Sequence, residues 1–174
     1  MAITQANKIY HNAQYYGDIV FAGTVALPSS TVENADVKSD ADIGYAKLQH
    51  VHHVTLTQAD GSAVADESRV VFIARAPCTV LAVECALLTV AAGDSTVDVD
   101  VQQSTGGGAF ASILTAAESL DSSTVVRTVV EATLDGTPTL ADGDMLLIDI
   151  DATAGTGTLP QGLIVDVTIA EEGQ

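Results

Sequence analysis

The stretch His50-Val51-His52-His53 has residue types and a spacing that could bind a metal ion. Side chains alternate between the two faces of a β-strand, so a strand here would project His50 and His52 from one face, about 6–7 Å apart. Two imidazoles can share a metal ion, and copies around a three-fold axis could complete its coordination shell. Polar residues at the entrance to a first strand are the simpler interpretation. We therefore predict no bound metal and keep His50 and His52 as candidates only.

Aspartates two residues apart form a second arrangement that could do chemistry. The pairs are Asp98 with Asp100, Asp142 with Asp144, and Asp149 with Asp151. Calcium needs six or more oxygen ligands from converging loops. Two of these pairs lie in alternating, strand-like sequence, and the third flanks a glycine as in a turn. We therefore predict no calcium site and no cofactor.

Residues that could catalyse a reaction are not arranged in a recognisable motif. No serine lies in a GxSxG turn, and Cys78 has no basic neighbour in the sequence that would favour its thiolate. The loop Gly106-Gly107-Gly108 lacks the lysine and the following helix of a phosphate-binding loop. We expect the chain to have no catalytic residues and not to be an enzyme.

The charge of the chain excludes some classes of partner. Its 174 residues carry a formal net charge of −17, with only six basic side chains. Affinity for nucleic acid and for anionic lipid depends on Lys and Arg, so we expect neither nucleic-acid nor membrane binding. No stretch has the length and apolarity of a membrane span, and the N-terminus lacks a signal-peptide pattern. We expect the chain to fold in a cytosol.

The first 48 residues differ from the rest of the chain. They hold all four tyrosines, and polar residues interrupt each apolar run. Such a segment cannot form its own core, and tyrosine is common at protein interfaces. We predict that residues 1–48 are an extended arm that binds a partner, with a short helical turn that Asp40 would cap. The predicted contact residues are Tyr10, Tyr15, Tyr16, Ile43, Tyr45 and Leu48.

Residues 49–174 are predicted to form one all-β domain. Tryptophan is absent and aromatic residues make up 4% of the chain, so the core must be built from Val, Ile, Leu and Ala. Short apolar or alternating runs are separated by turn residues such as Asp60-Gly61 and Asp135-Gly136, which favours an eight-stranded antiparallel sandwich of jelly-roll type. The predicted strands are 50–57, 69–75, 79–90, 96–102, 110–115, 124–132, 145–151 and 163–169. A helical turn within 111–120 is an alternative for that segment.

The predicted strand 79–90 is apolar on both faces. Its outer face would then need cover from the arm or from a neighbouring subunit, which indicates an oligomer. Cys78 and Cys85 would lie about 23 Å apart on opposite faces of this strand, too far for a disulfide. We predict two buried thiols.

Two segments before the sandwich resemble a linker of tailed-bacteriophage virion proteins. They are Leu27-Pro28-Ser29-Ser30-Thr31-Val32-Glu33-Asn34-Ala35-Asp36-Val37 and Ala41-Asp42-Ile43-Gly44-Tyr45-Ala46-Lys47-Leu48. Ala46 stands where the linker has serine, and Asp42 where it has alanine. Downstream, the strand and glycine-rich hairpin at 97–108, the stretch 140–150 and the strand 162–167 are similar in order to a recurrent phage β-sandwich.

The resemblance implies a structural virion protein, foremost a capsid decoration (cement) protein that is a homotrimer. Its partner would be the major capsid protein, on the capsid exterior, after assembly in the host cytoplasm. Two alternatives stay open. One is a tail-fibre or receptor-binding module that attaches to host-surface glycan or protein. The other is a minor tail or neck component.

Overall fold

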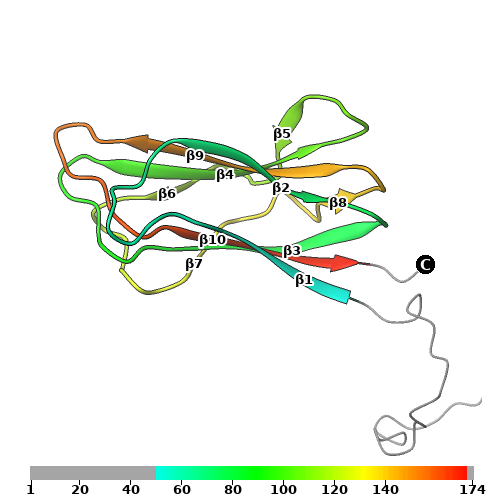
Figure 1. Cartoon of the computed structure of the whole chain (residues 1–174), viewed down its shortest axis with the longest axis horizontal. Helices are drawn as coiled ribbons and strands as arrows, with labels where there is room; N and C mark the ends of the chain where they lie inside the picture. The colour runs from blue at the N-terminus through cyan, green and yellow to red at the C-terminus, as the bar shows by residue number, and fades with distance from the viewer. Residues whose placement is uncertain (1–49, 172–174) are drawn as a thin grey trace, which may run out of the picture. The chain divides into compact units, whose positions relative to one another are not determined.

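The computed structural model describes residues 50–171, which form a β-sandwich without any helix (Figure 1). Within this part of the chain, therefore, no helix could cross a membrane. The predicted arm and its six contact residues lie outside the described residues. The strands are β1 (His50–Thr57), β2 (Glu67–Ile73), β3 (Cys78–Ala86), β4 (Thr96–Ser104), β5 (Phe110–Ser112), β6 (Glu118–Leu120), β7 (Val130–Glu131), β8 (Thr139–Leu140), β9 (Met145–Thr153) and β10 (Ile164–Glu171).

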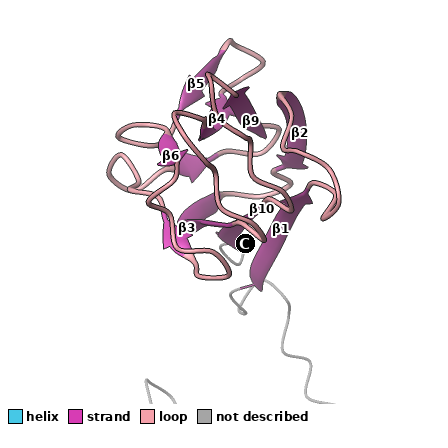
Figure 2. Ribbon diagram, turned by 90° about the vertical axis from the view of Figure 1, so that its left-hand side faces the viewer, coloured by secondary structure: helices cyan, strands magenta, loops and turns pink. Residues whose placement is uncertain are grey.

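The strands form two antiparallel sheets that face each other (Figure 2). Sheet I has the order β1-β10-β3-β7, with β8 also paired to β3, and sheet II has the order β2-β9-β4-β5, with β6 also paired to β4. In chain order, β1 to β4 alternate between sheet I and sheet II, β5 and β6 stay in sheet II beside β4, and the chain then alternates again through β7 and β8 in sheet I, β9 in sheet II and β10 in sheet I. This alternation, with four strand positions in each sheet, is that of a jelly roll.

The ten strands fill eight positions because two of the strands are broken. β5 pairs with the end of β4 and β6 with its beginning. β7 and β8 likewise pair with opposite ends of β3. The predicted all-β sandwich is confirmed, whereas the helical turn within 111–120 and the long strand 124–132 are wrong. Residues 121–129 form turns and irregular backbone, and only Val130–Glu131 pairs as a strand.

The core is aliphatic, as the composition predicts. Inward positions of β4, β9 and β10 alternate with solvent-facing polar residues, so each strand contributes three or more buried branched side chains. The core triplets are Val97, Val99 and Val101; Leu146, Ile148 and Ile150; and Val165, Val167 and Ile169. Their burial between the sheets is the main favourable term in folding.

A β-bulge in β3 changes which residues face the core. Val80 pairs with Ile169 and Ala82 pairs with Thr168, which leaves Leu81 as an extra residue that is 49% exposed. The extra residue shifts the inside–outside alternation by one position. Cys78 and Cys85 therefore both face the core and are buried, so the prediction of opposite faces is wrong. The prediction of two buried thiols is confirmed.

The same bulge corrects the predicted apolar outer face of this strand. β3 ends at Ala86, so Leu87–Val90 do not extend the sheet. Its outward positions after the bulge are Ala82, Glu84 and Ala86, all partly buried within the sheet. After the bulge, the outer face of β3 thus carries two small alanines and one glutamate, and it lacks the large apolar surface on which the argument for an oligomer was based.

Candidate functional site

Two of the three histidines of β1, His52 and His53, contact acidic side chains of the neighbouring strand β10. His52 places Nε2 2.9 Å from Glu171 Oε2, and its ring centroid lies 6.2 Å from that of Phe72 on β2. His50 is exposed. Within residues 50–171, no group of three or more His, Cys, Asp or Glu side chains is arranged to hold a metal ion. The sequence-predicted pair His50 and His52 thus shares a strand but does not converge on a site.

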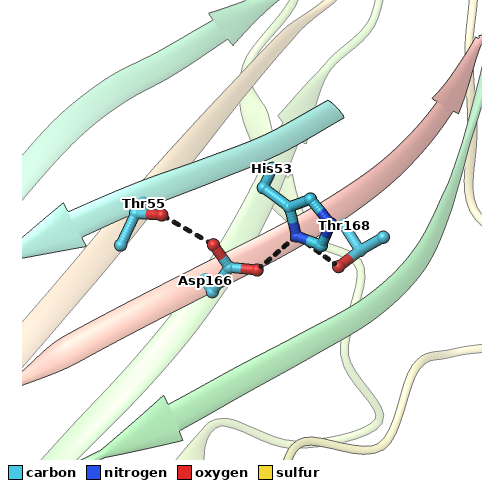
Figure 3. A network of polar contacts seen from close by, with 4 residues as sticks. All are labelled: His53, Thr55, Asp166 and Thr168. Atoms are coloured by element: carbon cyan, nitrogen blue, oxygen red, sulfur yellow. Dashed lines mark hydrogen bonds and ion pairs between the residues drawn. The ribbon is translucent and has the colours of Figure 1, made fainter. Parts of the chain in front are cut away.

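His53 belongs to a polar network on the outer face of sheet I, between β1 and β10 (Figure 3). Its Nδ1 atom lies 3.0 Å from Asp166 Oδ2 and 3.3 Å from Thr168 Oγ1. Thr55 donates a hydrogen bond of 2.6 Å to Asp166 Oδ1. Burial raises the pKa of Asp166, but the hydrogen bonds from Thr55 and His53 outweigh it, so the pKa lies below its usual value.

This network lacks the geometry of a nucleophilic triad. In such a triad the carboxylate binds one ring nitrogen and the hydroxyl binds the other, so that the ring can accept the hydroxyl proton. Here Asp166 and Thr168 both contact Nδ1 of His53. The arrangement orients the imidazole and links two strands, but it does not activate Thr168.

The outer face of sheet II carries an array of carboxylates that neither strand reveals alone. In the register of β4 and β9, Asp98 lies opposite Asp151, and Asp100 lies opposite Asp149. Like charges directly opposite each other on a sheet destabilise it. We call these four residues the acidic face. Ser68 and Ser112 donate hydrogen bonds to Asp149 and Asp100, and no described residue forms a salt bridge to any of the four.

The third predicted aspartate pair is separated by the fold. Asp142 is exposed, whereas Asp144 is 3% exposed. Asp144 accepts hydrogen bonds from the backbone N–H groups of Gly106 and Ala141, at 2.9 Å each, and from Gln103. The two backbone bonds are the main reason that its pKa lies below the usual value. Asp144 therefore organises two loops, and its oxygens are already occupied.

An apolar pocket of about 290 Å³ opens where β3 ends and β10 begins, and sequence analysis did not identify it. Ala86, Leu87, Leu88, Gly162 and Ile164 form its apolar wall, and Asp60 and Arg127 are its charged members. We call it the Arg127 pocket. Two loops are hydrogen-bonded to the same short segment: Arg127 N–H donates to Leu87 O at 2.9 Å, and Leu88 N–H donates to Gln161 O at 3.0 Å. The pocket is thus built into the fold.

Arg127 has an unusual backbone for an arginine. Its φ angle is +57°, and it is the one non-glycine residue among those described that has a positive φ. The left-handed conformation costs an L-residue about 1–2 kcal/mol, and such strain is concentrated at functional sites. Arg127 forms no salt bridge with a described residue. The sequence could have indicated Arg127 as a candidate, because it is the single Lys or Arg in residues 76–174.

Comparison with known proteins gives no family for this chain. No protein-family model matches it, and no curated protein does so either. Among solved structures, a chain in the structure of the infectious bursal disease virus Gx strain is similar to this one. The match covers 87% of this chain, with 11% sequence identity and a TM-score of 0.38. The Gt strain of the same virus matches over 87% as well, with 11% identity and a TM-score of 0.33. The chain spans 38% and 42% of the length of those two structures. These low TM-scores support no argument about function.

Proposed function

We propose that this chain is a structural, non-enzymatic virion protein that decorates and stabilises the outer surface of a tailed-phage capsid. The observation that carries the proposal is the phage-like linker at residues 27–48, which directly precedes the jelly-roll domain in the sequence. Jelly rolls are common in viral capsid proteins, although the fold alone does not determine a function. The chain would act as a homotrimer, with the major capsid protein as its partner.

The charge of the molecule supports a location on the capsid exterior. Net charge is −17, so packaged DNA would repel the chain from the lumen. The four carboxylates of the acidic face add a concentrated negative surface on sheet II. Residues 1–48, with their tyrosines, are the proposed contact with the capsid subunits. Assembly would take place in the host cytoplasm.

A binding experiment with capsid shells that lack this protein tests the proposal. The full chain is mixed with such shells and sedimented, and residues 1–48 are probed with a protease before and after mixing. We expect saturable cosedimentation and protection of residues 1–48 on the shells. A variant with Tyr10, Tyr15 and Tyr16 replaced by serine should bind the shells at least 10-fold more weakly than the wild type. A chain that stays in the supernatant at every concentration contradicts the proposal.

The alternative of a receptor-binding module makes a different prediction. Glycan sites commonly stack a sugar on an aromatic side chain, and residues 49–174 contain neither Trp nor Tyr. Binding of the full chain to a glycan array, without cosedimentation with capsids, would favour that alternative.

A further inference from the structure

The Arg127 pocket and the loop that carries Arg127 form a surface that no other part of residues 50–171 covers. Val125 and Val129, two residues on either side of Arg127, are 66% and 58% exposed. These are the most exposed large apolar side chains among the described residues. Ile164 on the pocket wall is also exposed. An apolar surface around an arginine that forms no salt bridge with the described residues is typical of a docking site for another protein surface that carries carboxylates.

The outer face of sheet II has the complementary composition. Its acidic face lies beside exposed apolar residues on the same side of the sheet: Val70 pairs with Leu147, next to the pair of Ser68 with Asp149, and Ile73 pairs with Met145. Among residues 50–171, these carboxylates form no salt bridge, and the apolar side chains beside them are exposed. Asp149 is the carboxylate nearest in register to Val70.

A single molecule cannot bring these two surfaces together. Ala86 and Ile164 of the pocket wall occupy outward positions on sheet I, and the acidic face lies on the outer side of sheet II. The two sheets meet through their inner faces, so these outer faces point in opposite directions (Figure 2). Contact between the surfaces must therefore join two copies.

We propose that the Arg127 pocket of one copy docks on the acidic face of a second copy, with Arg127 against Asp149 and Asp100. Val125 and Val129 then cover the apolar residues Val70 and Ile73. Such a contact joins two different surfaces, and repetition of a head-to-tail contact closes a ring when the rotation fits. The added guanidinium also relieves the repulsion within the acidic face. The inference rests on the homotrimer of the proposed function and assigns its interface.

Charge reversal with rescue tests this contact in the full chain. Arg127→Asp, Asp149→Arg and the double variant are compared with the wild type by sedimentation velocity over a range of concentrations, at about 0.15 M salt to screen the long-range repulsion between acidic copies. We expect the wild type to form a trimer. Each single variant should raise the concentration for half-assembly at least 10-fold, and the double variant should restore it to within a few-fold of the wild type.

Arg75→Asp is the matched control, because it makes the same change of charge at an exposed arginine outside the pocket. It should leave assembly unchanged, and circular dichroism should show that all variants are folded. If neither Arg127→Asp nor Asp149→Arg changes the concentration for half-assembly of the trimer, the proposed interface is wrong. A wild type that stays monomeric overturns the interface and the homotrimer together, whereas cosedimentation with capsids reports separately on the capsid role.

Discussion

Aspartate side chains that hold loops together are the most informative single residues of this domain. Asp94 binds Thr156 through its backbone N–H and hydroxyl, Asp121 binds Ser123 in the same way, and Asp144 binds Gly106 and Ala141. In each case these hydrogen bonds lower the pKa of the carboxyl group. In a strongly acidic sequence, the carboxylates that stabilise loops therefore cannot be told from those that only contact solvent.

Asp144→Asn is expected to destabilise the protein by an amount that depends on pH. The folded pKa of Asp144 lies below its unfolded value, so its contribution to stability is complete above the usual aspartate pKa of about 4 and is lost as pH falls through the folded value. The variant should melt roughly 5 °C or more below the wild type at pH 7. The difference should shrink as the pH falls below about 4. Thermal melts at several pH values measure it, and a constant difference would contradict this role.

Cys85 is expected to be chemically inert in the folded protein. Burial, followed by the charges of Glu118 and Glu84, raises the pKa of its thiol to about 12. Since the thiolate is the reactive species, the native protein should not react with a thiol reagent at pH 8 within minutes. Both cysteines should react at once in denaturant. Rapid native labelling of one thiol per chain would contradict the buried position.

At the scale of elements, the bulge in β3 is the feature on which the sheet depends. Leu81 lets Cys78 and Val80 face the core on one side of the bulge, and Val83 and Cys85 on the other. Without the extra residue, one of these pairs would turn to solvent, because side chains alternate strictly along a regular strand. The bulge also explains why alternation alone misplaced the cysteines.

Deletion of Leu81 should therefore be far worse than its substitution. The deletion is expected to cost more than about 3 kcal/mol, since two buried side chains leave the core. Leu81→Thr keeps the bulge at an exposed position and should change the free energy of unfolding by no more than about 0.5 kcal/mol. Urea unfolding of both variants measures the contrast. Equal effects would show that the side chain, and not the extra backbone unit, matters.

At the scale of the whole molecule, repulsion between the many carboxylates opposes folding and depends on the salt concentration. The domain holds its like charges close together, with the acidic face on sheet II and a row of Asp166, Glu84 and Glu131 across sheet I. Repulsion between such charges weakens as salt is added. The same repulsion keeps free copies apart, so a contact between copies requires local complementarity such as that proposed for Arg127.

Asp98→Asn should stabilise the domain, and most strongly at low salt. The substitution removes one of two carboxylates that lie opposite each other, Asp98 and Asp151. We expect a gain of about 0.2–1 kcal/mol in the free energy of unfolding at low ionic strength. The gain should decrease at about 1 M salt, where the Debye length is near 3 Å. Urea unfolding at two salt concentrations measures this difference, and a destabilised variant would contradict the repulsion.

The sequence alone determined the class of fold and the material of the core. Period-two alternation in segments such as 97–101 and 148–151 and the wealth of β-branched residues are local properties, and turn residues mark where strands end, so the sandwich and the full extent of β1 were predicted. Short strands such as β6 and β8 have too few residues to show an alternating pattern. Their pairing with β4 and β3 depends on contacts between segments that are distant in the sequence.

The candidate sites were decided only by the tertiary structure. His50 and His52 were selected by spacing along a strand, but the contacts of His52 come from Glu171 and Phe72, which are far away in the sequence. The acidic face requires the register between β4 and β9, and the Arg127 pocket is lined by four separate segments of the chain. The alternation of residues along a strand specifies which face of the sheet a side chain occupies. Its neighbours on that face depend on pairing between segments that are distant in the sequence, and the complete core stabilises this pairing.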